Sequence, residues 1–470
     1  MKKVCMISLG CSKNLVNSEK ILAQYDRKTT EFVNEPEIAD EIIVNTCSFI
    51  DSATEESVNM IHEMSKFGGK VLVAGCLAER FGDELLEELP EIDGIISTSN
   101  EQVTTNNYGR IASQFISIRK IKRKNFRRKF HNHYSLFIIH PSLFNRVLST
   151  PPGTAYLKIA EGCNNRCSFC VIPKIKGNYI SFPHKEIIAE AKSLAAQGVR
   201  ELIIIAQDTT AYRDTLHDCG VVPPLSRGGG ITEGDDGGVC NTYNLSHLLT
   251  DLSHINGIQW LRLHYCYPEL VTDELIELIA TNPKIVKYID MPIQHCNDEI
   301  LRKMGRKSRK AELLSLLETL RERVPSLAIR TSLMVGFPGE TEEQFEELCE
   351  FVRRIKFERM GVFRFSPQDE TAAAAMANQV PEDEKQRRFD ALMQIQGEIA
   401  KDYSKSLLGR ELEVIIQGTD ADGNLIARTH ADSLDIDCIV LLPGQTAPLG
   451  TITKAKIIDT HGYDLIAELI

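Results

Sequence analysis

The chain of 470 residues is 43% hydrophobic and 25% charged, with a formal net charge of −11. A chain of this length builds about two to four domains, with cores large enough to need no disulfide bonds. The net negative charge argues against general nucleic-acid binding, which needs a basic surface. No run of about 18 apolar residues is present, so we expect no membrane span. The first residues lack the pattern of a signal peptide.

The thirteen cysteines are the unusual feature of the composition. Their odd number, the length of the chain and the missing signal peptide argue against a secreted, disulfide-bonded protein. We therefore expect a cytoplasmic protein in which some cysteines bind metal and the others pack in the core.

The first hundred residues of the chain alternate strand-like and helix-like segments. Strands are predicted at 4–8, 41–45 and 71–74, and each is followed by a cysteine: Cys11, Cys47 and Cys76. Because the carboxyl ends of parallel strands lie at one edge of a sheet, these cysteines are predicted to converge. They would then hold an iron–sulfur cluster with one open iron. The alternative is three separate, buried, apolar cysteines.

Two segments interrupt this alternation. Eight of the eleven residues at 119–129 are Lys or Arg, which is typical of a solvated linker; a phosphate-binding patch is the alternative. Residues 213–243 are rich in glycine and proline and predict a long surface loop. Cys219 and Cys240 in this loop have no ligand-like spacing.

Residues 150–400 predict a barrel built from repeated βα units. Strands are expected at 156–159, 201–206, 259–263, 286–292, 328–335 and 360–365, with helices such as 184–197 and 310–323 between them. Six such repeats favour an α/β fold of the partial TIM-barrel type.

Three cysteines, Cys163, Cys167 and Cys170, follow the first of these strands in a C-x3-C-x2-C loop. Three thiolates within eight residues can hold three corners of a [4Fe–4S] cluster and leave the fourth iron open. This spacing is typical of radical S-adenosylmethionine (SAM) enzymes, in which the open iron chelates SAM and an electron from the cluster cleaves it. Phe169 occupies the aromatic position usual in that motif. A zinc site is the alternative, but zinc prefers four ligands in paired spacings.

Other residues at predicted strand ends are candidates for binding SAM at the mouth of the barrel. The turn at 336–341, GFPGET, has glycines that permit close approach of the backbone to a ligand. The SAM-binding candidates are Phe169, Gln207, Asp208, Gln294, His295, Gly336, Gly339 and Glu340. For His295 a purely structural role is the alternative.

After a helical connector at 381–408, residues 406–470 predict a small β-barrel with strands at 412–417, 425–429, 439–441 and 452–459. This segment contains ten acidic and four basic residues, a net charge of −6. Such a module repels phosphate and suits a basic protein partner.

Together these motifs resemble the radical SAM methylthiotransferases. The resemblance rests on residues 8–19, SLGCSKNLVNSE, on the C-x3-C-x2-C loop and on the terminal β-barrel, and it covers most of the chain outside 101–150 and 213–243. It implies three domains: a cluster domain at 1–140, a radical SAM barrel at 150–400 and a TRAM domain at 406–470. It also implies two [4Fe–4S] clusters, the second held by Cys11, Cys47 and Cys76.

Within this family the sequence is similar to the RimO-like branch, in the segments 9–14 LGCSKN, 207–212 QDTTAY, 292–295 PIQH and 463–468 YDLIAE. That branch adds a methylthio group to the β-carbon of an aspartate in a small-subunit ribosomal protein. One SAM donates a methyl group to a sulfur associated with the N-terminal cluster. A second SAM supplies the radical that removes a hydrogen from the β-carbon, where the methylthio group is then delivered.

The resemblance also implies partners: a basic ribosomal protein, free or in a ribosome or assembly intermediate, and an electron donor such as flavodoxin or ferredoxin. Two other functions stay open. A MiaB-like enzyme would modify an adenosine of transfer RNA, which the basic run at 119–129 would suit. A protein that binds RNA or the ribosome with purely structural clusters would have no activity. The segments 119–129 and 213–243 depart from the family pattern.

Overall fold

The structure, a computed structural model, describes residues 1–97, 116–120, 136–137, 146–215 and 242–470. Most of the basic run at 119–129 and of the insertion at 213–243, including Cys219 and Cys240, lies outside the described residues. No helix in the described ranges is both long and apolar enough to cross a membrane.

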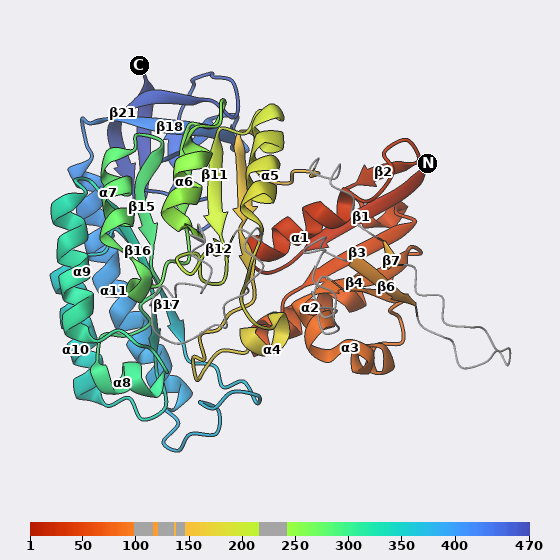
Figure 1. Cartoon of the computed structure of the whole chain (residues 1–470), viewed down its shortest axis with the longest axis horizontal. Helices are drawn as coiled ribbons and strands as arrows, with labels where there is room; N and C mark the ends of the chain where they lie inside the picture. Colours follow the sequence, from red (N-terminus) through yellow and green to blue (C-terminus); the bar gives the residue numbers. More distant parts are fainter. Residues whose placement is uncertain (98–115, 121–135, 138–145, 216–241) are drawn as a thin grey trace, which may run out of the picture.

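The N-terminal domain is a parallel sheet with helices packed on it (Figure 1). Its strand order is β2-β1-β3-β4-β5-β6-β7, in which β1 to β5 run parallel and the last two antiparallel. Its elements are β1 Lys2–Ser8, α1 Ser12–Leu22, β2 Thr30–Val33, η1 Pro36–Ile38, β3 Glu41–Thr46, α2 Asp51–Met64, β4 Lys70–Gly75, α3 Cys76–Glu88, β5 Gly94–Ser97, β6 Ile116–Lys120 and β7 Leu136–Phe137. The parallel sheet is confirmed. The sequence missed β2, a short strand of mixed burial.

The central domain contains six parallel strands in the order β17-β16-β15-β14-β11-β8, which confirms the partial barrel. The strands and helices of the barrel are β8 Thr154–Lys158, α4 Ile172–Lys176, α5 His184–Ala196, β11 Glu201–Ile205, α6 Leu245–Ser253, β14 Trp260–Leu263, η4 Pro268–Leu270, α7 Asp273–Thr281, β15 Ile285–Asp290, α8 Asp298–Lys303, α9 Lys310–Arg323, β16 Ala328–Val335, α10 Glu342–Ile355, β17 Arg359–Arg364 and α11 Glu382–Ser406. Two small ribbons, β9 Ala160–Glu161 with β10 Ile180–Ser181 and β12 Arg213–Thr215 with β13 Thr242–Asn244, lie outside this sheet.

Side chains alternate between the two faces of the barrel strands, as strand geometry requires. On β11, Leu202 and Ile204 pack under the surrounding helices in the main core. Ile203 and Ile205 face the interior, where they join Val16 of α1 and Leu434 of the C-terminal domain. The interior of this incomplete barrel is thus filled from the two neighbouring domains.

The C-terminal domain is a closed five-stranded barrel, as predicted (Figure 1). Its strands are β18 Glu411–Thr419, β19 Leu425–Thr429, β20 Val440–Leu442, β21 Ile452–His461 and β22 Asp464–Leu469. The sequence interpretation did not identify β22, which pairs with both β20 and β21 and so closes the barrel.

A buried charge network joins this C-terminal barrel to the beginning of the central strands. Glu201 is fully buried and pairs with Arg262 at 2.8 Å and with Arg428. Arg262 also donates to the carbonyl of His430 at 2.6 Å. Burial raises the pKa of Glu201, but the charges of Arg428 and Arg262 outweigh burial and lower this pKa to about 2.

The same interface changes the charge argument made from the sequence. Asp432 pairs with Arg359 and Asp437 with Arg330, and both aspartates are almost fully buried against the central domain. Without Asp432, Asp437 and Arg428, the segment 406–470 keeps eight acidic and three basic residues, a net charge of −5. The remaining surface is still acidic.

We expect Glu201→Ala to destabilise the protein by about 3–5 kcal/mol, because it leaves two buried guanidinium groups without their carboxylate. Urea unfolding of the anaerobically purified protein measures this. The control is Glu318→Ala, which removes an exposed pair with Arg354 and should cost less than about 1 kcal/mol. Equal losses in the two variants would contradict the structural role of Glu201.

The stability should also fall in acid. The pKa of Glu201 is lowered from its ordinary value of 4.5 to about 2, so its contribution is complete above pH 4.5 and is lost as the pH falls toward 2. Thermal unfolding midpoints recorded across this range should drop steeply for the wild type and less steeply for Glu201→Gln.

Candidate functional site

The cysteine loop of the barrel lies between β9 and α4 and is held by its neighbours at 303–306. The backbone N–H of Ser168 donates to the carbonyl of Met304 at 3.0 Å, and the Ser168 hydroxyl donates to the carbonyl of Lys303 at 2.8 Å. A Cβ at Gly305 would lie 2.8 Å from the carbonyl oxygen of Arg166, so only glycine fits there. Phe169 packs among the apolar side chains Ile300, Met304 and Phe337.

The thiols of this loop converge and are shielded from water. Cys163 and Cys167 are buried and Cys170 is half-buried. Burial, together with the neighbouring thiols, raises the pKa of Cys163 to about 11 and that of Cys170 to about 12. Thiolates are therefore costly here unless a cation is bound, and iron supplies that charge. The donor set fits a cluster.

Cys11, Cys47 and Cys76 also converge, as their positions after successive strands predict. Asn14 links the three strand ends: its Nδ2 donates to the carbonyls of Leu9 at 3.2 Å and Thr46 at 2.7 Å, and its Oδ1 accepts from the Cys76 thiol at 3.7 Å. Gly10, at φ +87°, lies directly against Cys47, since an added Cβ would be 3.2 Å from its sulfur.

The electrostatics of these three thiols differ from one another. Burial raises the pKa of Cys76 to about 12. At Cys11 desolvation also opposes ionisation, but the charge of Lys13 and the backbone N–H groups of Asn14 and Lys13 outweigh it and lower the pKa. Among the described residues, no three His, Cys, Asp or Glu side chains stand as ligands of a single metal ion.

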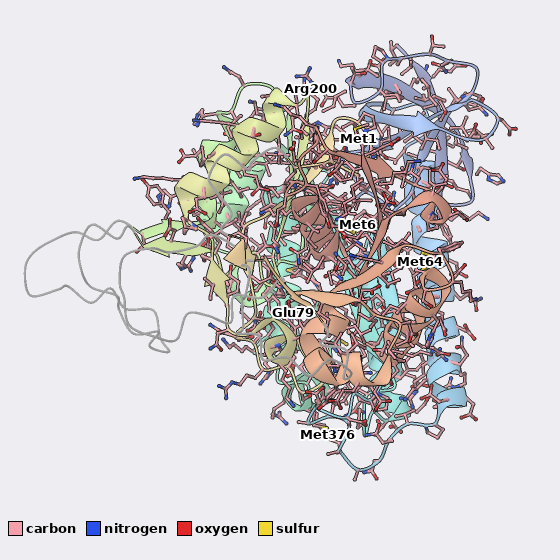
Figure 2. All side chains as sticks on the ribbon, turned by 90° about the vertical axis from the view of Figure 1, so that its right-hand side faces the viewer. Met1, Met6, Met64, Glu79, Arg200 and Met376 are labelled. Atoms are coloured by element: carbon pink, nitrogen blue, oxygen red, sulfur yellow. The ribbon has the colours of Figure 1, made fainter. Side chains whose placement is uncertain are left out.

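The two sets of cysteines face each other across the contact between α3 and α4. Cys76, at the start of α3, packs on Val171, which follows Cys170 directly in the chain, and on Ile175 of α4. Figure 2 shows the N-terminal domain lying over the barrel, with Glu79 of α3 in the region of this contact.

A polar network ties α1 to the mouth of the barrel beside this contact. Lys158 Nζ donates to Asn17 at 2.6 Å and to Glu161 at 2.6 Å. Glu161 also accepts from Gln207 Nε2 at 2.7 Å. Burial raises the pKa of Glu161, but the charges of Lys158 and Lys176 lower it to about 2. The amide oxygen of Gln207, Oε1, is buried with no partner in the described structure and is free to accept a hydrogen bond from a ligand.

Asp208 supports the C-x3-C-x2-C loop indirectly, through hydrogen bonds. Its carboxylate accepts from Asn165 at 2.8 Å, from the Thr210 hydroxyl at 3.0 Å and from the Ala211 backbone at 3.1 Å. Because Asn165 lies between Cys163 and Cys167, Asp208 orders that loop.

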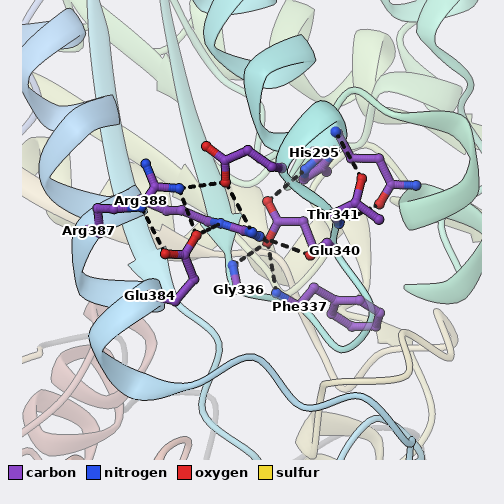
Figure 3. A network of polar contacts seen from close by, with 10 residues as sticks. His295, Gly336, Phe337, Glu340, Thr341, Glu384, Arg387 and Arg388 are labelled. Carbon is purple, nitrogen blue, oxygen red and sulfur yellow. Dashed lines mark hydrogen bonds and ion pairs between the residues drawn. The ribbon is translucent and has the colours of Figure 1, made fainter.

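His295 and Glu340 form a buried network that supports the 336–341 turn (Figure 3). The Glu340 carboxylate accepts from the backbone N–H groups of Gly336 and Phe337 and from His295 at 3.4 Å, and it forms an ion pair with Arg388 at 3.3 Å. The Asn297 backbone donates to His295 Nδ1 at 2.9 Å, so the proton of this ring lies on Nε2. The hydrogen bonds of His295 and Glu340 are therefore made to other residues of the fold.

Gly336 and Gly339 have different surroundings, although both have positive φ. A Cβ at Gly336 would overlap the side chain of Lys385, so this glycine makes room for α11. At Gly339 the nearest atom would be Lys303 Nζ at 3.3 Å. Gln294, four residues after the end of β15, adopts φ +72°, a conformation that costs energy for a residue with a side chain and is common at binding sites.

Comparison with known proteins gives matches along most of the chain. Residues 3–97 match the "Uncharacterized protein family UPF0004", residues 157–352 the "Radical SAM superfamily" and residues 408–470 the "TRAM domain". A "Ribosomal protein uS12 methylthiotransferase RimO" from Thermoanaerobacter sp. is 41% identical over 100% of both chains. Proteins of the same name from Desulfitobacterium hafniense and Anaeromyxobacter sp. are 37% and 42% identical, over 100% of this chain and 99% and 93% of theirs.

The chain belongs to the RimO family.

In this RimO-family chain the three matched regions contain the features described above. The first includes Cys11, Cys47 and Cys76, the second includes the C-x3-C-x2-C loop and the 336–341 turn, and the third covers the closed C-terminal barrel. The domain limits 1–140, 150–400 and 406–470 stay predictions.

Sequence reasoning missed several residues of this site. Asn14 and Asn17 stood in the 8–19 motif without an assigned role, and the Lys158–Glu161 pair has the spacing of an ordinary surface pair. Tyr265 meets Ser12, and Tyr267 and Arg306 approach Cys167, only through the fold, so none of the three gave a signal in the sequence.

We expect Cys11→Ala and Cys163→Ala each to lose about half of the iron and sulfide of the reconstituted wild type, because each removes a ligand of a different cluster. Iron and sulfide quantification with Mössbauer spectroscopy measures the loss. The matched control is Cys349→Ala, a buried cysteine of α10 away from both sets, which should keep its iron. Loss of all iron from either single variant would contradict two independent clusters.

Proposed function

We propose that this chain adds a methylthio group to the β-carbon of an aspartate in the small-subunit ribosomal protein uS12, with two [4Fe–4S] clusters and SAM as cofactors. The observation that carries the proposal is the meeting of two cysteine triads, each at the carboxyl ends of a parallel sheet, across α3 and α4. Relatives named for this reaction match the full length of the chain.

The chemistry explains why two sites must lie close together. The β-carbon of an aspartate that keeps its charge has no readily removed proton, so a base at this position would be ineffective and a radical is needed. When bound, the clusters and SAM supply the methyl group, the sulfur and a radical that abstracts hydrogen. Hydrogen removal and sulfur delivery then take place at the same carbon.

The residues of the chain hold and enclose these groups. We assign Cys163, Cys167 and Cys170 to one cluster and Cys11, Cys47 and Cys76 to the other. Asp208 positions the barrel loop through Asn165, and the buried Oε1 of Gln207 would be available to accept a hydrogen bond from SAM. Gln294 and the backbone at Gly339 line the same mouth, while His295 and Glu340 keep the 336–341 turn in place.

The acidic surface of the C-terminal barrel supports a basic protein substrate. Its net charge of −5 outside the buried pairs attracts a basic ribosomal protein and repels RNA phosphates. The substrate is free uS12 or uS12 in the ribosome or an assembly intermediate, in the cytoplasm. An electron donor such as flavodoxin or ferredoxin reduces the barrel cluster.

Mass spectrometry of ribosomal proteins from a strain lacking this gene should show uS12 without the methylthio group, and the wild-type gene should restore it. Genes carrying Cys11→Ala or Cys163→Ala should fail to restore it, since both clusters are required. A control gene carrying Cys349→Ala should restore the methylthio group as the wild-type gene does.

Nucleoside analysis of the same strains tests transfer-RNA methylthiolation, the alternative that the basic run at 119–129 suggested. We expect no change in methylthio-adenosine. Loss of methylthio-adenosine from transfer RNA, with the methylthio group of uS12 still present, would replace the proposal by this alternative. Normal methylthiolation of both transfer RNA and uS12 would overturn both functions. Failure of the reconstituted protein to form 5′-deoxyadenosine from SAM would favour purely structural clusters.

Gln207→Ala should weaken SAM binding by about tenfold, because it removes the buried acceptor and its link to Glu161. Calorimetric titration of the reconstituted protein with SAM measures this, alongside iron content, which should stay at the wild-type level. Gln197→Ala, at the exposed end of α5, is the control. An unchanged dissociation constant would remove Gln207 from the SAM site.

A further inference from the structure

Lys13, two residues after Cys11, reaches from the N-terminal domain to the rim of the barrel. Its Nζ lies over the ring of Tyr265, 3.3 Å from the ring centroid. The neighbouring Ser12 hydroxyl is 3.5 Å from the Tyr265 hydroxyl. Tyr265 comes shortly after β14 and adopts φ +57°, with its backbone N–H donating to Asp290 at 3.0 Å. This ring therefore has a fixed position at the mouth of the barrel.

The same short segment also touches the barrel loop. The hydroxyl of Tyr267 lies 4.0 Å from the Cys167 sulfur, and the guanidinium of Arg306 lies 4.2 Å from the Tyr267 ring centroid. Tyr265 and Tyr267 are two residues apart. Tyr265 contacts the segment that follows Cys11, and Tyr267 contacts the C-x3-C-x2-C loop. Lys13 thus lies at the junction of the two sets of cysteines, where the reacting carbon must be placed.

Lys13 differs from two nearby cations that have carboxylate partners. Lys158 pairs with Glu161 at 2.6 Å, and Arg330 pairs with Asp290 at 2.9 Å. Within the described ranges, Lys13 forms no ion pair with a carboxylate. It is half-buried with an aromatic face on one side. The charge of Lys13 acts on the nearby Cys11 thiol, and an ammonium that is partly removed from water retains further donors for an anion.

We propose that Lys13 binds the carboxylate of the aspartate that is modified in the substrate protein. The inference rests on the proposed function, which requires an aspartate β-carbon at this mouth. That carbon is bonded directly to the carboxylate carbon, so anchoring the carboxylate limits where the β-carbon can lie. An ion pair at this point also selects aspartate over asparagine, which has the same shape without the charge.

The carboxylate of SAM is the other source of an anion at this mouth. The two sources are separable, because SAM binding is measured in the absence of the protein substrate. A lysine that serves the target aspartate leaves the SAM affinity unchanged.

The experiment combines enzyme variants with substrate variants. The reconstituted wild type, Lys13→Met, Lys13→Gln and Lys13→Arg are titrated with uS12 carrying its target aspartate and with uS12 carrying asparagine there. Each enzyme is also titrated with SAM, and its iron content and 5′-deoxyadenosine formation without uS12 are recorded. The matched control is Lys28→Met, an exposed lysine of the same domain.

We expect asparagine to weaken binding to the wild type by about ten- to a hundredfold. Lys13→Met and Lys13→Gln should bind the aspartate form of uS12 more weakly by a similar factor. These two variants should no longer distinguish the aspartate form from the asparagine form. Lys13→Arg should keep most of the discrimination, and Lys28→Met all of it. SAM affinity, iron and 5′-deoxyadenosine should match the wild type throughout.

Three results would overturn the inference while leaving the proposed function intact. They are continued discrimination by Lys13→Met and Lys13→Gln, weakened SAM binding with unchanged uS12 binding, and loss of the N-terminal cluster iron from both variants. A wild-type enzyme that neither binds nor modifies uS12 would instead refute the proposed function, and the inference with it.

Discussion

The packing of Cys76 against Val171 and Ile175 joins the two halves of the site, because these residues adjoin the cysteines of both domains. Any shift of α3 on α4 would change the separation of the two sets of thiols. The contact is reinforced at α1, where Lys158 donates to Asn17 and the buried Arg146 pairs with Glu19 and, at 2.9 Å, with Glu190. Buried ion pairs of this kind contribute geometric specificity more than stability.

The incomplete barrel creates a second constraint. Six strands leave an open inner face, and apolar residues on it must be covered. Val16 from α1 and Leu434 from the C-terminal domain provide this cover for Tyr156, Ile203 and Ile205. The two flanking domains are therefore part of the barrel interior, so the N-terminal domain and the barrel mouth are held in one arrangement.

The C-terminal barrel lies at the beginning of the central strands, while the cysteine loops lie at their ends (Figure 1). Its acidic surface and the reactive mouth are therefore separate features of the molecule. Charge on that surface acts over a longer range than a side-chain contact, as the proposed attraction of a basic substrate protein requires. In the proposed function, placement of the reacting aspartate depends on Lys13 at the mouth itself, and placement of SAM depends on Gln207.

The sequence by itself determined the architecture and the cysteine sets, because both follow from local patterns: strand-like segments ending at cysteines and three thiols within eight residues. Only the tertiary structure decided which side chains surround them. Glu201 meets Arg428 across 227 positions and Ser12 meets Tyr265 across 253, and no local spacing encodes such pairs. Gly336 shows the same limit: its sequence context suggested room for a ligand, but the fold fills that space with Lys385. Likewise, part of the charge counted at 406–470 is neutralised by arginines of another domain. Local order follows from neighbouring residues, whereas the partners of a buried charge depend on how the domains pack.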